Sequence, residues 1–154
     1  MNLKETISND LKQAMLARDE LKVSTLRMLT SAIKYSEIAR GGAGSQASDE
    51  EVLSLVQKEI KQRQESIESF KLGKREDLVQ KETQEMEILK SYLPPQLSVE
   101  EIRILVRDAV VSSGARSLAE MGKVMGILMP QIKGKANGTL VSQIVKEELG
   151  KPIS

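Results

Sequence analysis

Apolar residues recur three or four positions apart along almost the whole chain. In its first quarter these positions are Leu3, Ile7, Leu11, Met15, Leu26, Leu29 and Ile33. This spacing places apolar side chains on one face of an α-helix, whereas a β-strand requires alternation with a period of two residues. The alternating pattern appears nowhere in the sequence. We therefore expect an all-α fold.

Breaks in this pattern divide the chain into seven expected helices. They span residues 2–17, 20–39, 49–72, 76–92, 99–113, 118–129 and 138–149. The third is a rod of about 35 Å, because an α-helix rises ~1.5 Å per residue. Its polar face includes Glu59 and Arg63, which are four residues apart. We expect the third and fourth helices to form a long antiparallel hairpin.

Local signals mark several helix ends. The capping pattern Ser-x-x-Glu, in which serine and glutamate side chains satisfy each other's backbone amides, favours a helix start. It occurs at Ser48/Glu51, Ser98/Glu101 and Ser117/Glu120. At the other end of the third helix, Gly73 is expected to adopt the left-handed conformation that often closes a helix.

The strongest break is Leu93-Pro94-Pro95. Proline lacks the amide donor that a helix needs, and it displaces the preceding residue from helical geometry. We place a domain boundary there. The expected domains are an all-helical N-terminal domain of residues 1–93 and a small three-helix C-terminal domain of residues 94–154.

The chain contains no Cys and no His. This excludes Cys/His zinc sites, Cys-His and Ser-His-Asp nucleophile systems and disulfide frameworks. We therefore expect no catalytic residue, no metal and no cofactor. The N-terminus also lacks the apolar core of a signal peptide, and no run approaches the roughly 20 apolar residues that span a bilayer. We expect a cytoplasmic protein without a membrane partner.

Positive charge gathers in the last third of a chain whose formal net charge is only +1. Glu120 is the one acidic residue between positions 111 and 146, and the basic residues there are Arg116, Lys123, Lys133, Lys135 and Lys146. Such a local excess is typical of a surface that attracts an anion.

A lysine and glycine loop lies inside this basic segment. Lys133 and Lys135 flank Gly134, just before a helix that begins near Asn137 or Gly138. Ammonium groups and the unpaired amides of a helix start can converge there on one phosphate. The P-loop pattern of nucleotide-binding proteins is absent. A solvated turn whose lysines only maintain solubility is the alternative.

Only three residues are aromatic, and all of them precede the two prolines: Tyr35, Phe70 and Tyr92. The C-terminal domain therefore cannot stack bases on aromatic side chains as single-strand binders do. Any RNA would be recognised through its phosphates and overall shape, and DNA is not an expected partner.

Other features of the basic segment have competing interpretations. Gly122 and Gly126 interrupt the sixth helix, at a cost of about 1 kcal/mol each relative to alanine. We favour the close approach of a neighbouring helix over the approach of an RNA backbone. The apolar residues of the same helix could form either part of the core or an adaptable ligand-binding surface. We favour core packing for Leu118, Met121, Met125, Leu128 and Met129. The acidic pair Glu147/Glu148 lies in a last helical turn, where the helix dipole disfavours it.

Four segments of the chain together resemble the YqeY family. They are RMLTSAIKYSEI, VQKEIKQRQESIE, KREDLVQKETQEMEILKSYLPPQLS and MGKVMGILMPQIKGKANGTLVSQIVKEEL. The C-terminal part is similar to the tail of GatB, the tRNA-engaging subunit of the glutamine-dependent aspartyl/glutamyl-tRNA amidotransferase. Gly126 replaces a commonly larger or charged residue of the family pattern, and Asn137 replaces a common aspartate.

The resemblance implies a non-catalytic tRNA-binding accessory module. The glutaminase and transamidation chemistry of the amidotransferase belong to another subunit and to a separate domain, and neither matches this chain. The implied partners are tRNA and a protein of tRNA aminoacylation or amidation. The expected RNA-binding residues are Arg116, Lys123, Lys133, Gly134, Lys135, Asn137, Gly138 and Lys146.

Two alternatives stay open. One is a helical protein-interaction adaptor that presents the surface of the long hairpin. The other is an accessory of glutamine-dependent carbon–nitrogen ligase activity. An enzyme acting by itself ranks behind all of these, because the chain lacks the residues that most catalytic sites use.

Overall fold

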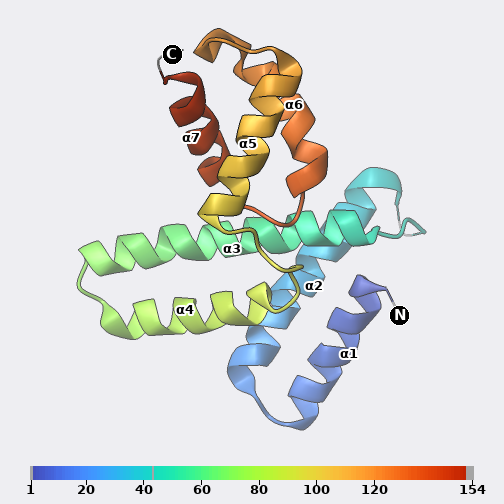
Figure 1. Cartoon of the computed structure of the whole chain (residues 1–154). Helices are drawn as coiled ribbons and strands as arrows, with labels where there is room; N and C mark the ends of the chain where they lie inside the picture. Colours follow the sequence, from blue (N-terminus) through green and yellow to red (C-terminus); the bar gives the residue numbers. More distant parts are fainter. Residues whose placement is uncertain (1, 43, 152–154) are drawn as a thin grey trace. The chain divides into compact units, whose positions relative to one another are not determined.

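The computed structural model describes residues 2–42 and 44–151 (Figure 1). This described part forms seven α-helices and one short 3-10 turn, with no β-strand. The all-α prediction is confirmed. The chain divides between Leu93 and Pro94 into two compact units, residues 1–93 and 94–154, which we call the N-terminal unit and the C-terminal unit.

Helices pack in pairs within the N-terminal unit. Its elements are α1 (Leu3–Leu16), α2 (Glu20–Gly41), α3 (Asp49–Leu72) and α4 (Glu76–Lys90). α3 and α4 lie side by side and run in opposite directions, and α1 packs against α2 (Figure 1). The apolar faces share one core, whose largest fully buried side chains are Ile7, Leu26, Leu29, Ile33 and Leu89.

Tyr92 ties the end of α4 to α1. Its hydroxyl donates a hydrogen bond of 2.6 Å to Oδ2 of Asp10, 82 residues away in the sequence. Burial, together with this hydrogen bond, raises the pKa of the Tyr92 hydroxyl well above its ordinary value. The hydroxyl therefore remains a hydrogen-bond donor throughout the neutral pH range.

Two of the three expected capping boxes are present. Ser48 accepts a hydrogen bond from the amide of Glu51, and Ser98 accepts one from the amide of Glu101, with the return bond formed in both cases. These contacts start α3 at Asp49 and a later helix at Val99, as the sequence predicted.

Two predictions about helix ends are wrong. Ser117 caps no α-helix, because Leu118–Glu120 form a 3-10 turn and the α-helix begins only at Met121. Gly73 does not adopt the left-handed conformation, since its φ is −84°. The next residue, Lys74, takes that role with a φ of 56°. Sequence signals locate a helix end within a residue or two, but cap geometry selects the residue.

Arg63 lies in the interior instead of on a polar surface of α3. Its exposed fraction is 3%, and its guanidinium forms ion pairs with Glu59 on α3 and Glu85 on α4. The Nε atom lies 3.4 Å from Oε2 of Glu85 but makes no hydrogen bond within the described residues. Glu59 and Arg63 form the pair that their four-residue spacing indicated, but their face of α3 is covered by α4 instead of exposed to solvent.

The C-terminal unit is a small bundle in which each helix contacts the other two. Its elements are α5 (Val99–Ser113), the 3-10 turn η1 (Leu118–Glu120), α6 (Met121–Ile132) and α7 (Gly138–Leu149). α6 continues through Pro130, three residues beyond its expected end. The core of the unit includes Ile102, Val106, Val124, Leu128, Val141, Ile144 and Val145.

Candidate nucleic-acid interface

The loop between α6 and α7 has a defined shape. Gly134 adopts a φ of +78°, which favours glycine, and it is buried. Its carbonyl accepts a 2.9 Å hydrogen bond from Nε2 of Gln96, and the Lys135 carbonyl accepts a 2.8 Å bond from the amide of Leu97. The loop is therefore held against the segment that precedes α5, and the LPPQLS and KGKANG motifs meet in space.

The lysine side chains of this loop lie on its outer side. Lys133 and Lys135 are exposed, and the following Asn137 caps α7 by accepting a 2.8 Å hydrogen bond from the amide of Thr139. We call Lys133, Gly134, Lys135, Asn137 and Gly138 the loop cluster.

Two amides at the start of α7 remain available to a ligand. In residues 2–42 and 44–151, the amides of Gly138 and Leu140 have no hydrogen-bond acceptor. The positive end of the α7 dipole lies at the same place. An anion at this helix start would meet backbone donors and lysine charge together.

The other three expected binding residues lie at the opposite end of the bundle. Arg116 precedes η1, Lys123 is in the first turn of α6, and Lys146 is in the last turn of α7. We call these three the far cluster. Because α6 and α7 run in opposite directions (Figure 1), their free ends lie together, away from the loop. The helix rise of ~1.5 Å per residue separates Lys123 from Lys133 by about 15 Å.

The basic side chains of the far cluster are not neutralised by acids in the described part of the chain. Arg116, Lys123 and Lys146 are exposed and have no side-chain partner in the part of the chain that the structure describes. The same holds for Lys135 in the loop cluster. The expected residues thus form two separated positive regions, and one phosphate cannot reach both.

The acidic pair next to Lys146 is held by other basic residues. Arg103 of α5 donates 3.1 Å hydrogen bonds to Glu147 and Glu148, and Glu148 also forms ion pairs with Arg107 and Lys151. Burial alone would raise the pKa of Glu148, but hydrogen bonds from Lys151, Arg103 and Arg107 lower it to about 2. Sequence reasoning missed these arginines, although their four-residue spacing on α5 was a usable signal.

Gly122 and Gly126 do not allow the close approach of a neighbouring helix. Both are exposed, and a Cβ atom at either position would have no heavy atom within 4 Å. The favoured interpretation is therefore wrong. These residues lie on the outer side of α6, because the inner side is formed by Val124, Leu128 and Ile132.

The outer face of α6 is also unusual in its backbone. Pro130 has no amide hydrogen, so it cannot donate the usual helix bond to the carbonyl of Gly126, four residues earlier. At ~100° per residue, Gly122, Gly126 and Met129 fall within about 60° of one another around the helix axis. On this face of α6, no side chain covers the backbone at Gly122 and Gly126, and the half-exposed Met129 lies beside them.

The methionine prediction is confirmed in part. Met121 and Met125 pack against the core of the C-terminal unit. Met129 is 44% exposed and Leu118 is 55% exposed, so their assignment to the core is wrong. Leu118 lies in the 3-10 turn, outside the register that the α-helical pattern assumed.

The described residues include no group of three or more acidic side chains placed to hold a metal ion. Within residues 2–42 and 44–151, no helix is long and apolar enough to cross a membrane.

Comparison with known proteins gives one consistent result. A family model described as "Yqey-like protein" matches residues 4–149. Proteins named "Altered inheritance of mitochondria protein 41, mitochondrial" are similar to the chain. The Saccharomyces cerevisiae protein is 34% identical over 125 residues, which cover 78% of this chain and 66% of the yeast protein. The Pyrenophora tritici-repentis protein is 36% identical over 146 residues, which cover 92% of this chain and 77% of that protein.

The chain therefore spans about two thirds of the yeast relative's length. The names of these relatives state no catalytic activity.

Proposed function

The chain belongs to the YqeY family, and from this premise we propose that its C-terminal unit binds tRNA without catalysing a reaction on it. The observation that carries the proposal is the set of exposed basic side chains that lack acidic partners in the described residues: Arg116, Lys123, Lys135 and Lys146. The resemblance of this unit to the tRNA-engaging tail of GatB makes tRNA the polyanion to test first.

The separation of the two basic clusters supports contact with two regions of a folded RNA. The loop cluster offers the Lys135 ammonium together with the amides of Gly138 and Leu140, which suits a phosphate. The far cluster lies about 15 Å away along α6 and would contact a second stretch of backbone. Shape and phosphate recognition of this kind needs no aromatic stacking.

The outer face of α6 lies between the clusters and supports close approach of the RNA backbone. Gly122 and Gly126 have no side chain to hold a ligand away, and open space lies over both. The Gly126 carbonyl receives no helix hydrogen bond from position 130, because proline has no amide hydrogen to donate. A ribose 2′-hydroxyl can donate a hydrogen bond to such a carbonyl, which DNA cannot do.

Fluorescence anisotropy with labelled tRNA tests the proposal. We expect binding at low salt that weakens steeply towards the physiological ionic strength of about 0.15 M. The double variant Lys133→Ala/Lys135→Ala should bind more weakly and reduce the slope of log affinity against log salt by about 2.

Lys58→Ala/Lys61→Ala is the matched control, because both lysines are exposed on α3 and the net charge changes equally. It should leave the affinity and the slope nearly unchanged. Undetectable binding at low salt, or equal binding by wild type and the loop variant, would exclude tRNA recognition through this loop.

The proposed context is an accessory role beside a glutamine-dependent tRNA amidotransferase, in the cytoplasm. Its support is the similarity to the GatB tail. If both proteins use the same region of tRNA, adding this chain to a transamidation assay should raise the apparent KM for the aminoacylated tRNA. The Lys133→Ala/Lys135→Ala variant should not raise it. An unchanged KM with wild-type protein would contradict the accessory role beside the amidotransferase. It would not contradict tRNA binding itself.

A protein-interaction adaptor is the second candidate, and an observation on α2 favours it. Met28, Tyr35 and Ile38 are exposed there, with exposed fractions of 52%, 77% and 53%. The surface to test is therefore α2 in addition to the α3–α4 hairpin. Tyr35→Lys should release a protein partner that wild type retains in a pull-down, and retention of every partner would count against the adaptor.

A further inference from the structure

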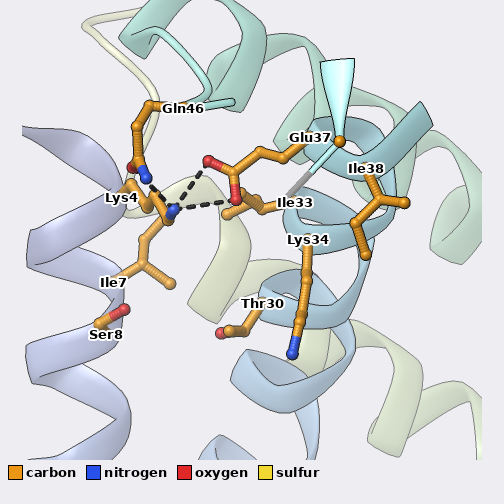
Figure 2. Close-up of a pocket in the computed structure, with 10 residues that line it drawn as sticks. Lys4, Ile7, Ser8, Thr30, Ile33, Lys34, Glu37, Ile38 and Gln46 are labelled. Atoms are coloured by element: carbon orange, nitrogen blue, oxygen red, sulfur yellow. Dashed lines mark hydrogen bonds and ion pairs between the residues drawn. The ribbon is translucent and has the colours of Figure 1, made fainter. Parts of the chain in front are cut away.

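A pocket of about 260 Å³ lies between α1 and α2 in the N-terminal unit (Figure 2). Ile7 and Ile33 form its buried apolar part, and the exposed Ile38 extends the apolar surface outwards. Pockets for drug-sized ligands occupy about 300–1,000 Å³, so this one suits a smaller molecule. Its apolar walls favour a short hydrocarbon chain.

One end of the pocket is closed by an ion pair that is already satisfied. Nζ of Lys4 donates hydrogen bonds of 2.9 and 2.7 Å to the Glu37 carboxylate and one of 3.0 Å to Oε1 of Gln46 (Figure 2). The amide of Ala47 donates a further 2.7 Å bond to Glu37. The hydrogen bonds from Lys4 and then Ala47 hold the pKa of Glu37 below its ordinary value. The pair is thus occupied internally, and its charges cancel.

Lys34 supplies the charge that a ligand can use. It is exposed, lines the pocket and has no side-chain partner in the described residues. Figure 2 shows its side chain extending along α2 towards Thr30. Ser8 lines the same pocket, and its hydroxyl has no hydrogen-bond partner in the part of the chain that the structure describes. An ammonium and a hydroxyl are therefore open in the pocket, and both can donate to a carboxylate.

We propose that this pocket binds a carboxylate carried on a short aliphatic chain. The chain lies over Ile7 and Ile33 and against the exposed Ile38, and the carboxylate pairs with the Lys34 ammonium, with the Ser8 hydroxyl as a second donor. Two sources share this chemistry: a free short-chain fatty acid, and the C-terminal residue of a polypeptide with an aliphatic side chain. The site belongs to the N-terminal unit and is independent of the proposed tRNA contacts.

Titration of the full-length protein followed by ¹H–¹⁵N correlation spectra tests the site. Hexanoate should shift amide signals of α1 and α2 saturably, with a Kd in the millimolar range for so small a ligand. Hexylamine has the same chain with the opposite charge, so it should bind about tenfold more weakly than hexanoate. Equal shifts from both ligands would show that Lys34 does not select the charge.

Charge reversal at one lysine provides the matched comparison. Lys34→Glu should weaken hexanoate binding about tenfold, since it removes an attraction and adds a repulsion. Lys12→Glu makes the same change of net charge at an exposed position of α1 outside the pocket, and it should not alter the Kd. Ser8→Leu fills the pocket and should abolish binding while Lys34 is intact. Circular dichroism verifies that each variant is folded.

The two sources are separated by N-acetylleucine and its amide. Tighter binding of N-acetylleucine than of hexanoate, with loss of binding for the amide, identifies a peptide C-terminus. The reverse order of affinity identifies a free acid. The proposal is overturned if neither acid gives saturable shifts, or if Lys34→Glu binds hexanoate as tightly as wild type does.

Discussion

Replacing Gly126 with alanine should stabilise the C-terminal unit. Gly126 lies inside α6, does not have a positive φ, and a methyl group there would meet no heavy atom within 4 Å. The substitution therefore introduces neither a clash nor a packing contact. The remaining effects are helix propensity and the smaller conformational freedom of alanine in the unfolded chain. Together they increase the free energy of unfolding by about 0.7–1 kcal/mol.

Thermal unfolding followed by far-ultraviolet circular dichroism measures this change. A gain of that size raises the Tm of a domain of 60–100 residues by roughly 3–8 °C. Gly114→Ala is the matched control, because a Cβ at Gly114 also has nothing within 4 Å, whereas the φ of Gly114 is +72°. Left-handed geometry costs alanine about 1–2 kcal/mol, so this variant should be less stable than wild type.

The two variants should thus change stability in opposite directions although both add one methyl group to open space. A lower Tm for Gly126→Ala would refute the reasoning, because it would mean that the outer face of α6 is packed in solution. The same variant also tests the RNA contact. Reduced tRNA affinity in the more stable protein supports approach of the RNA backbone to α6, and unchanged affinity removes Gly126 from the interface.

Three further predictions concern ionisable and hydrogen-bonding groups. Because the pKa of Glu148 is lowered from 4.5 to about 2, its carboxylate stabilises the folded state above pH 4.5, and this contribution is lost as the pH falls towards 2. Glu148→Gln should reduce the loss of unfolding free energy, measured in urea, between pH 4.5 and pH 2. An unchanged pH dependence would contradict the stabilising role of the Glu148 carboxylate. Arg63→Met leaves the buried Glu85 and the partly buried Glu59 without their cation. It should lower the free energy of unfolding, measured in urea at pH 7, by about 3–5 kcal/mol. Tyr92→Phe should lower the free energy of unfolding in urea by about 1 kcal/mol. An unchanged value would show that the hydrogen bond from Tyr92 to Asp10 contributes nothing to stability.

Several helix limits follow from local signals that the chain carries regardless of its tertiary fold. The third, fifth and seventh helices begin and end at the expected residues, at 49–72, 99–113 and 138–149. Capping residues and glycines act through backbone groups within one turn, so a sequence pattern can locate them. The sixth helix was misplaced because Pro130 is accommodated inside α6 and a 3-10 turn precedes that helix.

The sequence by itself also determined that the chain is helical and that its last third is basic, because periodicity and charge are properties of neighbouring positions. Only the tertiary structure decided which residues meet. It buried Arg63 against α4, placed Gly122 and Gly126 on an open face, and separated Lys123 from the lysine loop by the length of α6. Burial and pairing depend on which helix faces lie together, and residues far apart in the sequence set that arrangement.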